Sequence, residues 1–519
     1  MIFRSEMRLQ LMESAVIVGF YCYMCYFWNQ NFVKDTKHFN ILGCSVCAML
    51  LMSLHQVVPV IHRKASKDQE TADQPQVYRN KSDPGLWCSL LIPLALTTNL
   101  CLYPEVDKMP VMLALVFVAL HLVHFNPSTV TQLTCAGLLY WLREDFLSKE
   151  RPEQAVFVGL CVLVYILLGK IPGVFPQSFT DGELAVCLQS VIIPLYPVLV
   201  ISYKALQRGV TNISLPTSIS ISLLAYAGVM MGSLFICTIR TRNSAVRFLL
   251  SYGLALVAVL FLSVKLFGSP LPYRVLLHFL MESKVRVYLL VWWSVLVLIS
   301  LCVTMLNQNN KPSKGRTRVR KIFHILILGV YVPGLLYDAV LLFTASWVAL
   351  GCLIIAETVR LLQVPVFGPL LQKCYSVFLS AQDEGRLILT PIYLLVGFSL
   401  PLWIHTFQWC DFSDVLPLFA GLLSVGVGDT MASVVGSTIG KHKIFGSHKT
   451  VEGTVASIIF QLIFIFIIPY FSPVDVLHNR LVPVTGIVAA TSLLEASTSQ
   501  IDNHVLPLFM YNLLITLKS

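Results

Sequence analysis

The chain has 519 residues, of which 56% are hydrophobic and 12% are charged. A soluble globular domain carries about 25% charged residues, so this composition excludes an ordinary soluble protein and predicts that lipid surrounds much of the chain. The 37 Lys and Arg exceed the 27 Asp and Glu and give a net charge of +10. In a membrane protein that excess belongs mainly at cytoplasmic span ends, and it does not indicate nucleic-acid binding.

Apolar runs that are candidate membrane spans follow one another from residue 14 to residue 517. Several of them are shorter than the ~20 residues that a bilayer crossing needs, so the number of spans is a range. We therefore expect an all-α polytopic integral membrane protein with roughly 13–17 transmembrane helices and no large soluble domain. Arg4 and Arg8 precede the first run. Because no small-residue cleavage site follows it, this run is predicted to be an uncleaved anchor.

Two loops of the predicted topology are rich in Lys and Arg. They hold Arg63, Lys64, Lys67, Arg79 and Lys81, and then Lys311, Lys314, Arg316, Arg318, Arg320 and Lys321. The positive-inside rule predicts that both face the cytoplasm. An even number of expected spans separates them from each other and from the segment after Gly440, so this segment is predicted to be cytoplasmic too. The same parity places the glycosylation sequon at Asn80 in the cytoplasm and the one at Asn212 in the lumen.

The stretch VGVGDTMASVVGSTIGKHKIFGSHKTVEG, residues 425–453, differs from the apolar runs around it. In its first half, small residues recur every four positions at Gly428, Ala432, Gly436 and Gly440. Residues four apart share one face of a helix, and close packing against another helix would explain them. Packing does not explain Asp429, because a carboxylate at membrane depth is costly and favours a functional role.

Basic and acidic residues fill the second half of this stretch. One interpretation is a solvated basic loop at a span end. The other is a phosphate site, in which glycine N–H groups and lysines contact phosphate and carboxylates hold Mg²⁺. Known nucleotide motifs fit badly. Val435 stands where a Walker A loop needs its first glycine, and Gly426-x-Gly428 follows no βαβ pattern. The residues alone leave both interpretations open.

The spacing of this segment resembles the CTP-binding segment of dolichol kinases. It runs Asp429-x-x-Ala432-x-x-x-Gly436-x-x-x-Gly440 and, eight residues later, Lys449-Thr450-x-Glu452-Gly453. Four further stretches are similar to the same family: RKIFH (320–324), YVPGLLYD (331–338), GRLILTPIYLLVGFSLP (385–401) and LLEASTSQIDNHVLPL (493–508). We therefore expect a multi-span N-terminal region, 1–310, whose role is open. A membrane-embedded catalytic region, 311–519, should follow, with its CTP-binding segment at 425–453.

The resemblance implies a reaction. CTP would donate its γ-phosphoryl group to the hydroxyl of dolichol, giving CDP and dolichyl phosphate for protein glycosylation in the endoplasmic reticulum. CTP would arrive from the cytoplasm and dolichol from the bilayer, with a divalent cation, Mg²⁺, as cofactor. The protein is then a multi-pass endoplasmic reticulum membrane enzyme whose active site faces the cytoplasm. Nothing in the sequence specifies an oligomeric state.

The resemblance also implies roles for residues. Asp429, Lys449 and Glu452 are expected to be catalytic, with Asp429 and Glu452 as metal ligands. The remaining nucleotide-binding set is expected to comprise Gly428, Ala432, Gly436, Gly440, Lys441, Lys443, His448, Thr450, Gly453, Arg320, Lys321, His324 and Asp502. Glu495 and Gln500 lie at the same predicted span end as Asp502, where either a surface role or a place in the site is open.

Other functions compete with this one. Many spans with intramembrane acids also suit a transporter, but no Gly- or Pro-interrupted pair recurs in the two halves, and the polar chemistry lies in the C-terminal part. Another CTP-dependent lipid enzyme, either a cytidylyltransferase or a phytol-type kinase, is the nearer alternative.

Overall fold

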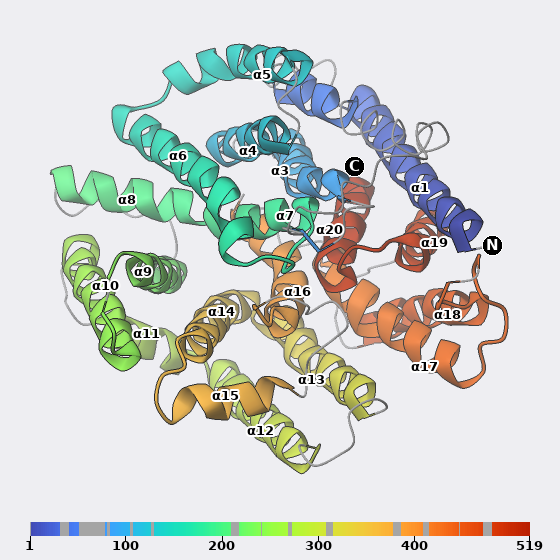
Figure 1. Cartoon of the computed structure of the whole chain (residues 1–519). Coiled ribbons are helices and arrows are strands. Elements are labelled where there is room, and N and C mark those ends of the chain that lie inside the picture. The colour runs from blue at the N-terminus through green and yellow to red at the C-terminus, as the bar shows by residue number, and fades with distance from the viewer. Residues whose placement is uncertain are drawn as a thin grey trace. The chain divides into compact units, whose positions relative to one another are not determined.

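The computed structural model describes fourteen stretches of the chain: residues 2–31, 41–50, 78–79, 84–103, 107–125, 129–208, 217–239, 241–267, 272–307, 315–376, 386–407, 415–445, 447–470 and 480–518. Within them the regular structure is helical, apart from one isolated antiparallel bridge between Lys443 and Thr450 (Figure 1). This confirms the expected all-α class. Asn80 and Asn212, on which the sequon prediction rests, lie outside these stretches.

Packing divides the chain into two compact units. The first comprises Met1–Glu150, Phe157–Ile193 and Leu400–Ser519, and the second comprises Arg151–Val156 and Pro194–Ser399. The first unit therefore joins N-terminal helices to the C-terminal segment that carries the glycine-rich stretch. The expected functional division at residue 310 concerns roles and stays a prediction.

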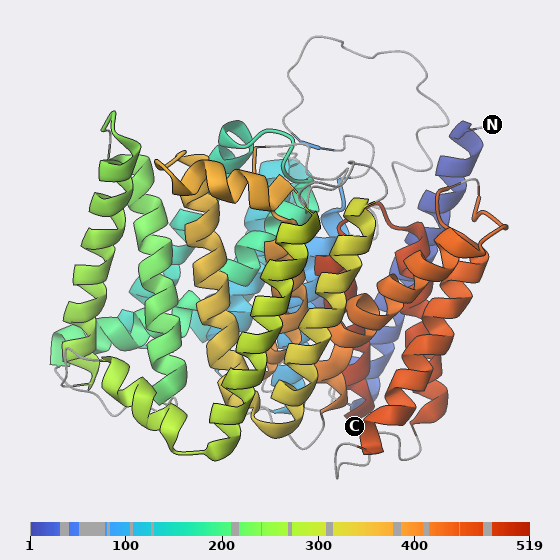
Figure 2. The ribbon, with the colours of Figure 1, turned by 90° about the horizontal axis from the view of Figure 1, so that it is seen from below.

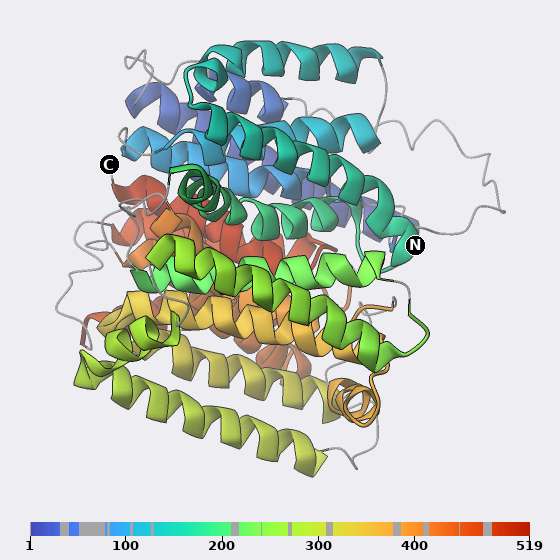
Figure 3. The same cartoon turned by 90° about the vertical axis from the view of Figure 1, so that its left-hand side faces the viewer.

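The first unit begins with α1 (Ile2–Asn31) and a short helix, Ile41–Leu50. Its other N-terminal helices are η2 (Leu86–Leu90), α3 (Leu91–Leu102), α4 (Met109–Phe125), α5 (Thr129–Leu147), most of α6 (Arg151–Val174) and α7 (Asp181–Ile192). Its C-terminal helices are η3 (Leu416–Phe419), η4 (Leu422–Asp429), α17 (Thr430–Thr438), α18 (Val451–Ile467), η5 (Ile468–Tyr470), α19 (Leu481–Ser497), α20 (Asp502–Ile515) and η6 (Thr516–Lys518). Segments distant in sequence lie side by side, with α1 against α19 and α3 against α20 (Figure 3).

The second unit is a set of helices. They are α8 (Leu195–Arg208), α9 (Thr217–Thr238), α10 (Ser244–Phe267), α11 (Pro272–Met281), α12 (Lys284–Asn307), α13 (Gly315–Tyr337), α14 (Ala339–Leu361), α15 (Phe367–Ser376) and α16 (Thr390–Phe407), whose last turns belong to the first unit. Within it α9 packs on α10 and α14, and α12 packs on α13 (Figure 2).

Nine helices in the described stretches are long and apolar enough to cross a membrane, and five shorter helices are apolar as well. Many apolar side chains on these helices face outward, including Leu249, Val257 and Leu298, which are 67%, 66% and 61% exposed. Exposed apolar surface on this scale is unfavourable in water and favourable in lipid. The structure thus agrees with the expected polytopic membrane fold.

The core of the first unit is α20. From His504 to Ile515 every residue of this helix is buried, so it is surrounded on all sides. Its neighbours include α3, η4 and α19. Because α20 begins at Asp502, the packing of this core decides where that carboxylate lies.

Candidate active site

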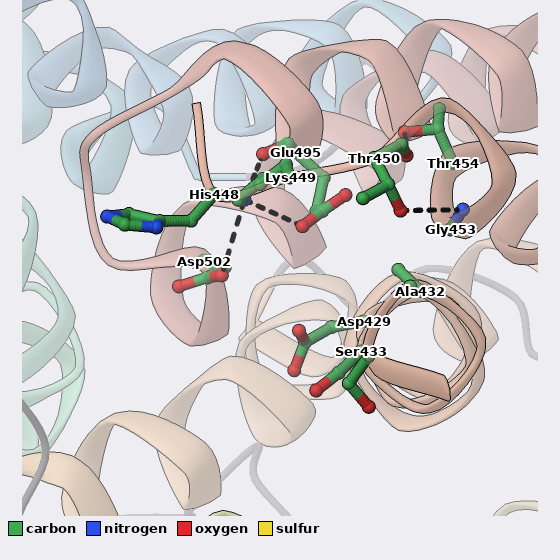
Figure 4. Close-up of a pocket in the computed structure, with 12 residues that line it drawn as sticks. Asp429, Ala432, Ser433, His448, Lys449, Thr450, Gly453, Thr454, Glu495 and Asp502 are labelled. Carbon is green, nitrogen blue, oxygen red and sulfur yellow. Dashed lines mark hydrogen bonds and ion pairs between the residues drawn. The ribbon is translucent and has the colours of Figure 1, made fainter. Parts of the chain in front are cut away.

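A polar pocket lies in the first unit where the ends of α17, α18, α19 and α20 converge. It has a volume of about 270 Å³. Its walls are formed by Asp429, Ala432, Ser433, Gly436, Ser437, His448, Lys449, Thr450, Gly453, Thr454, Glu495 and Asp502 (Figure 4). Eight of the residues expected at the site are therefore brought together: Asp429, Ala432, Gly436, His448, Lys449, Thr450, Gly453 and Asp502.

One wall of the pocket comes from a π-helical turn. The segment η4 winds as a π-helix and ends at Asp429, where the α-helix α17 takes over. Such turns occur often at functional sites, because the extra residue changes which side chains face inward. Asp429 and Ser433, one turn apart, both point into the pocket from this wall (Figure 4).

The opposite wall is a small hairpin between α17 and α18. Its backbone is closed by Val451 N–H donating to the His442 carbonyl (2.9 Å) and by Ile444 N–H donating to the Lys449 carbonyl (3.0 Å). The side chain of Thr450 then caps α18 by accepting from Gly453 N–H at 3.2 Å. Cap and hairpin together fix the direction in which the preceding residue, Lys449, projects.

Lys449 joins the hairpin to α19 and α20. Its Nζ donates to Glu495 Oε1 at 2.6 Å and to the Glu495 carbonyl oxygen, and lies 3.9 Å from Asp502 Oδ2. Burial lowers the pKa of Lys449, but the carboxylates of Glu495, Asp502 and Asp429 outweigh it and raise the pKa above its ordinary value. The ammonium is therefore charged at neutral pH. Its side chain keeps 33% of its exposure, so it remains accessible to a ligand.

Three carboxylates gather beside this lysine. One oxygen each of Asp429, Glu495 and Asp502 lies within 4.8 Å of the others, and the three residues come from η4, α19 and α20. Glu495 is buried, whereas Asp429 and Asp502 are partly exposed. Clustered carboxylate oxygens with one open side are the ligands that Mg²⁺ prefers in proteins, so the donor set fits the expected divalent cation.

The structure places Glu452 outside the pocket that Asp429 and Lys449 line, and its expected role as a catalytic residue and metal ligand stays a prediction. Its carboxylate accepts from His442 N–H (3.1 and 3.2 Å) and lies 2.6 Å from His442 Nδ1. Glu452 is the second residue of α18, and there it turns toward the base of the hairpin and not into the pocket. The carboxylate beside Lys449 in the pocket is that of Glu495.

The glycines mainly allow close packing. A Cβ on Gly440 would lie 2.4 Å from the Gly436 carbonyl, and one on Gly453 would lie 2.7 Å from the Ala432 carbonyl. A Cβ on Gly428, which does not line the pocket, would lie 2.7 Å from Gln461 Nε2 on α18. Their spacing thus lets α17, α18 and the hairpin approach each other, as close packing predicts. Gly436 and Gly453 also line the pocket.

Other expected residues lie away from these walls. Lys441 and Lys443 are exposed on the hairpin and do not line the pocket as described. Arg320, Lys321 and His324 belong to α13 in the second unit, outside this pocket; of the first two only the backbone is described. His324 is buried and lines a separate apolar cavity of that unit.

An all-α membrane bundle that gathers three carboxylates and a lysine at its helix ends belongs to the class of polytopic membrane enzymes. The family model for dolichol kinase matches residues 112–396. Dolichol kinase of Mus musculus is 35% identical over 75% of this chain and 74% of its own length, and that of Homo sapiens is 34% identical over 73% and 72%. Dolichol kinase EVAN of Arabidopsis thaliana is 31% identical over 47% of this chain and 43% of its own length. No solved structure matches. The chain belongs to the dolichol kinase family.

Proposed function

We propose that this protein transfers the γ-phosphoryl group of CTP to the hydroxyl of dolichol, releasing CDP, with Mg²⁺ as the cofactor. We place the reaction at the cytoplasmic face of the endoplasmic reticulum membrane. The proposal rests on membership of the dolichol kinase family and on the chemistry of the pocket formed by Asp429, Lys449, Glu495 and Asp502.

The charge of the pocket is the observation that best supports a cation-dependent reaction with a nucleotide. Three carboxylates face one ammonium, which leaves an excess of negative charge where a nucleoside triphosphate, itself an anion, would have to bind. A divalent cation held by Asp429, Glu495 and Asp502 would resolve this conflict, because it would neutralise the excess negative charge and attract the phosphate oxygens. When bound, the cation supplies the charge stabilisation on which phosphoryl transfer depends.

The side chains then have separate tasks. Lys449, held by Glu495, presents a fixed positive charge to the phosphates. Glu495 fixes that lysine and contributes to the acidic cluster, while Asp429, on the opposite wall, is placed to ligate the cation or to receive the proton of the attacking hydroxyl. His448 lines the pocket, and the exposed Lys441 and Lys443 on the same hairpin carry positive charge that would attract the remainder of the nucleotide.

The two substrates require access from two media. The pocket opens beside the exposed hairpin, which suits a nucleotide arriving from water. The helices that form it carry outward apolar side chains, among them Val434, Val455 and Ile459, at 43%, 47% and 49% exposure. This surface suits an isoprenoid alcohol arriving from the bilayer. A pocket at the end of apolar helices meets both needs.

The test is a reaction with purified protein, dolichol, Mg²⁺ and CTP labelled in the γ-phosphate. We expect labelled dolichyl phosphate and CDP, with ATP a much poorer donor. Asp429→Asn, which keeps the shape of the side chain, should lower the rate about 10²–10³-fold while the protein still accumulates. Equal rates with ATP would refute CTP as the donor, and near-normal activity of Asp429→Asn would refute the assigned site.

The same reaction separates the two enzyme classes. A cytidylyltransferase would transfer the nucleotide and release pyrophosphate, so the γ-label would appear in pyrophosphate and not in the lipid. Labelled lipid excludes that alternative.

A further inference from the structure

The loop between α19 and α20 separates two of the three pocket carboxylates. Glu495 lies in the last turn of α19, and Asp502 is the first residue of α20. The intervening residues, 498–501, therefore set the distance between these two carboxylates. Any group that fixes the position of this loop therefore also fixes the position of Asp502 relative to Glu495.

The loop is held by side chains from the N-terminal part of the chain. Thr498 Oγ1 donates to Glu13 Oε1 on α1 at 2.9 Å, and Gln500 Oε1 accepts from Thr180 Oγ1 at 2.7 Å. Ile501 N–H, at the N-cap of α20, donates to Glu183 Oε1 at 3.0 Å. Thr180 and Glu183 form the capping box that begins α7. Side chains at α1 and at the start of α7 thus form hydrogen bonds to the loop 498–501, more than 300 residues away in sequence.

This arrangement is buried. Glu183 has 0% exposure, and Glu13, Thr180 and Gln500 each have 1%. A Cβ added to Gly85, which has a φ of +62°, would lie 2.3 Å from the Gln500 side chain, so the loop fits tightly against the backbone there. A buried polar group that loses its partner pays its full desolvation cost. The loop can therefore leave this position only at a large cost in free energy.

Arg79 neutralises the buried acid. Its guanidinium lies 2.5 Å from both carboxylate oxygens of Glu183, and its side chain is 9% exposed. The positive-inside rule treats Arg79 as one charge of a solvated cytoplasmic loop, but this side chain is an internal partner of Glu183. The buried carboxylate that accepts from Ile501 N–H therefore has the Arg79 guanidinium as its ion-pair partner.

We propose that Glu183, neutralised by Arg79, is a positioning residue of the kinase: through Ile501 N–H it sets the place of Asp502 and so the affinity of the acidic cluster for its divalent cation. The inference rests on the proposed metal-binding function of Asp502. It gives the N-terminal region a part in catalysis without contact with either substrate. Residues that orient metal ligands commonly account for about 10–100-fold in metal affinity.

Two double variants test the bond itself. Arg79→Met with Glu183→Gln removes both charges but keeps an oxygen that can accept from Ile501 N–H. Arg79→Met with Glu183→Leu removes the same charges and leaves no acceptor. Both variants lack the buried charges, so their comparison is free of the cost of an unpaired charge. The Leu variant loses the acceptor for Ile501 N–H and, with it, the capping-box acceptor for Thr180 N–H. We expect the Leu variant to need about 10-fold more Mg²⁺ for half-maximal rate than the Gln variant, with similar half-saturating concentrations of dolichol.

Two further variants complete the experiment. Gln189→Ala removes another buried contact of α7, the bond from Gln189 Nε2 to the Ser89 carbonyl at 2.9 Å, and should leave the Mg²⁺ requirement unchanged at matched protein level. Asp502→Asn should raise the Mg²⁺ requirement directly. If Asp502→Asn does so but the Gln and Leu double variants agree, Glu183 is not a positioning residue and the proposed function stands. If Asp502→Asn has no effect on the Mg²⁺ requirement, the metal site and the positioning role are both wrong.

Discussion

Lys449 and Glu495 form the ion pair on which the pocket depends. The side chain of Glu495 is 7% exposed, so its carboxylate relies on the lysine for its charge balance. Because the carboxylates raise the pKa of Lys449, the stability contributed by the charged lysine is fully present below the ordinary lysine pKa while Glu495 is ionised. It is lost as the pH rises through the higher folded value. Titration of Lys449 therefore does not set the activity profile near neutral pH.

The Lys449–Glu495 ion pair predicts that substitution of Lys449 lowers both activity and stability, and that the two effects can be separated. Lys449→Met should abolish activity and also destabilise the protein by about 3 kcal/mol, at the lower end of the range because the lysine is partly exposed. Lys449→Met combined with Glu495→Gln should recover the stability and stay inactive, because the lysine charge expected to hold phosphate and one carboxylate of the acidic cluster are both lost. Apparent melting temperature in detergent and kinase rate, measured on the same preparations, check this. A double variant with near-normal rate would contradict a phosphate role for Lys449.

At the scale of elements, the position of the hairpin depends on its contact with α17. Gly440 follows this helix, and an added Cβ would lie 2.4 Å from the Gly436 carbonyl and 2.6 Å from Thr450 Oγ1. The backbone carbonyl cannot give way, so the hairpin that carries His448 and Lys449 would have to shift. Overpacking of this kind costs about 1–3 kcal/mol.

Gly440→Ala should therefore lower the melting temperature and raise the half-saturating CTP concentration several-fold. Gly486→Ala is the matched control, because Gly486 lies in α19 of the same unit and a Cβ there meets nothing within 4 Å. That change should be neutral or stabilise the helix by about 0.5–1 kcal/mol. Equal behaviour of the two variants would show that the close approach at Gly440 is not needed.

At the scale of the whole molecule, the orientation in the membrane decides which medium supplies the nucleotide. We predict that Lys443→Cys, on the exposed hairpin, reacts with a membrane-impermeant maleimide in sealed microsomes whose cytoplasmic face is outward, above the background of the parent protein. We also predict that Asn80 carries no glycan. Labelling of Lys443→Cys only after detergent, or a glycan on Asn80, would reverse the orientation and exclude a cytoplasmic site.

Much of this architecture follows from local sequence. Apolar runs and sparse charge were enough to predict an all-α membrane protein, since the burial of a helix in lipid depends on the residues of that helix alone. The four-residue recurrence from Gly428 to Gly440 predicted close packing for the same reason. Asp429 and Lys449 could be selected as candidate site residues from their immediate neighbours in the sequence. An acid inside an apolar run and a lysine close to glycines can be recognised without knowing which residues they contact.

The composition of the acidic cluster was decided by tertiary packing. Glu452 lies three residues from Lys449, yet the first turn of α18 directs it to His442, and the lysine pairs with Glu495, 46 residues away. Glu495 could be noticed in the sequence because it is a charged residue at the end of an apolar helix. The sequence did not predict that this helix end lies at the pocket. The hydrogen bond from Ile501 N–H to Glu183 joins residues 318 positions apart, and no local pattern in the sequence predicts it. Such pairs depend on how whole helices pack around α20, and that packing is a property of the folded chain.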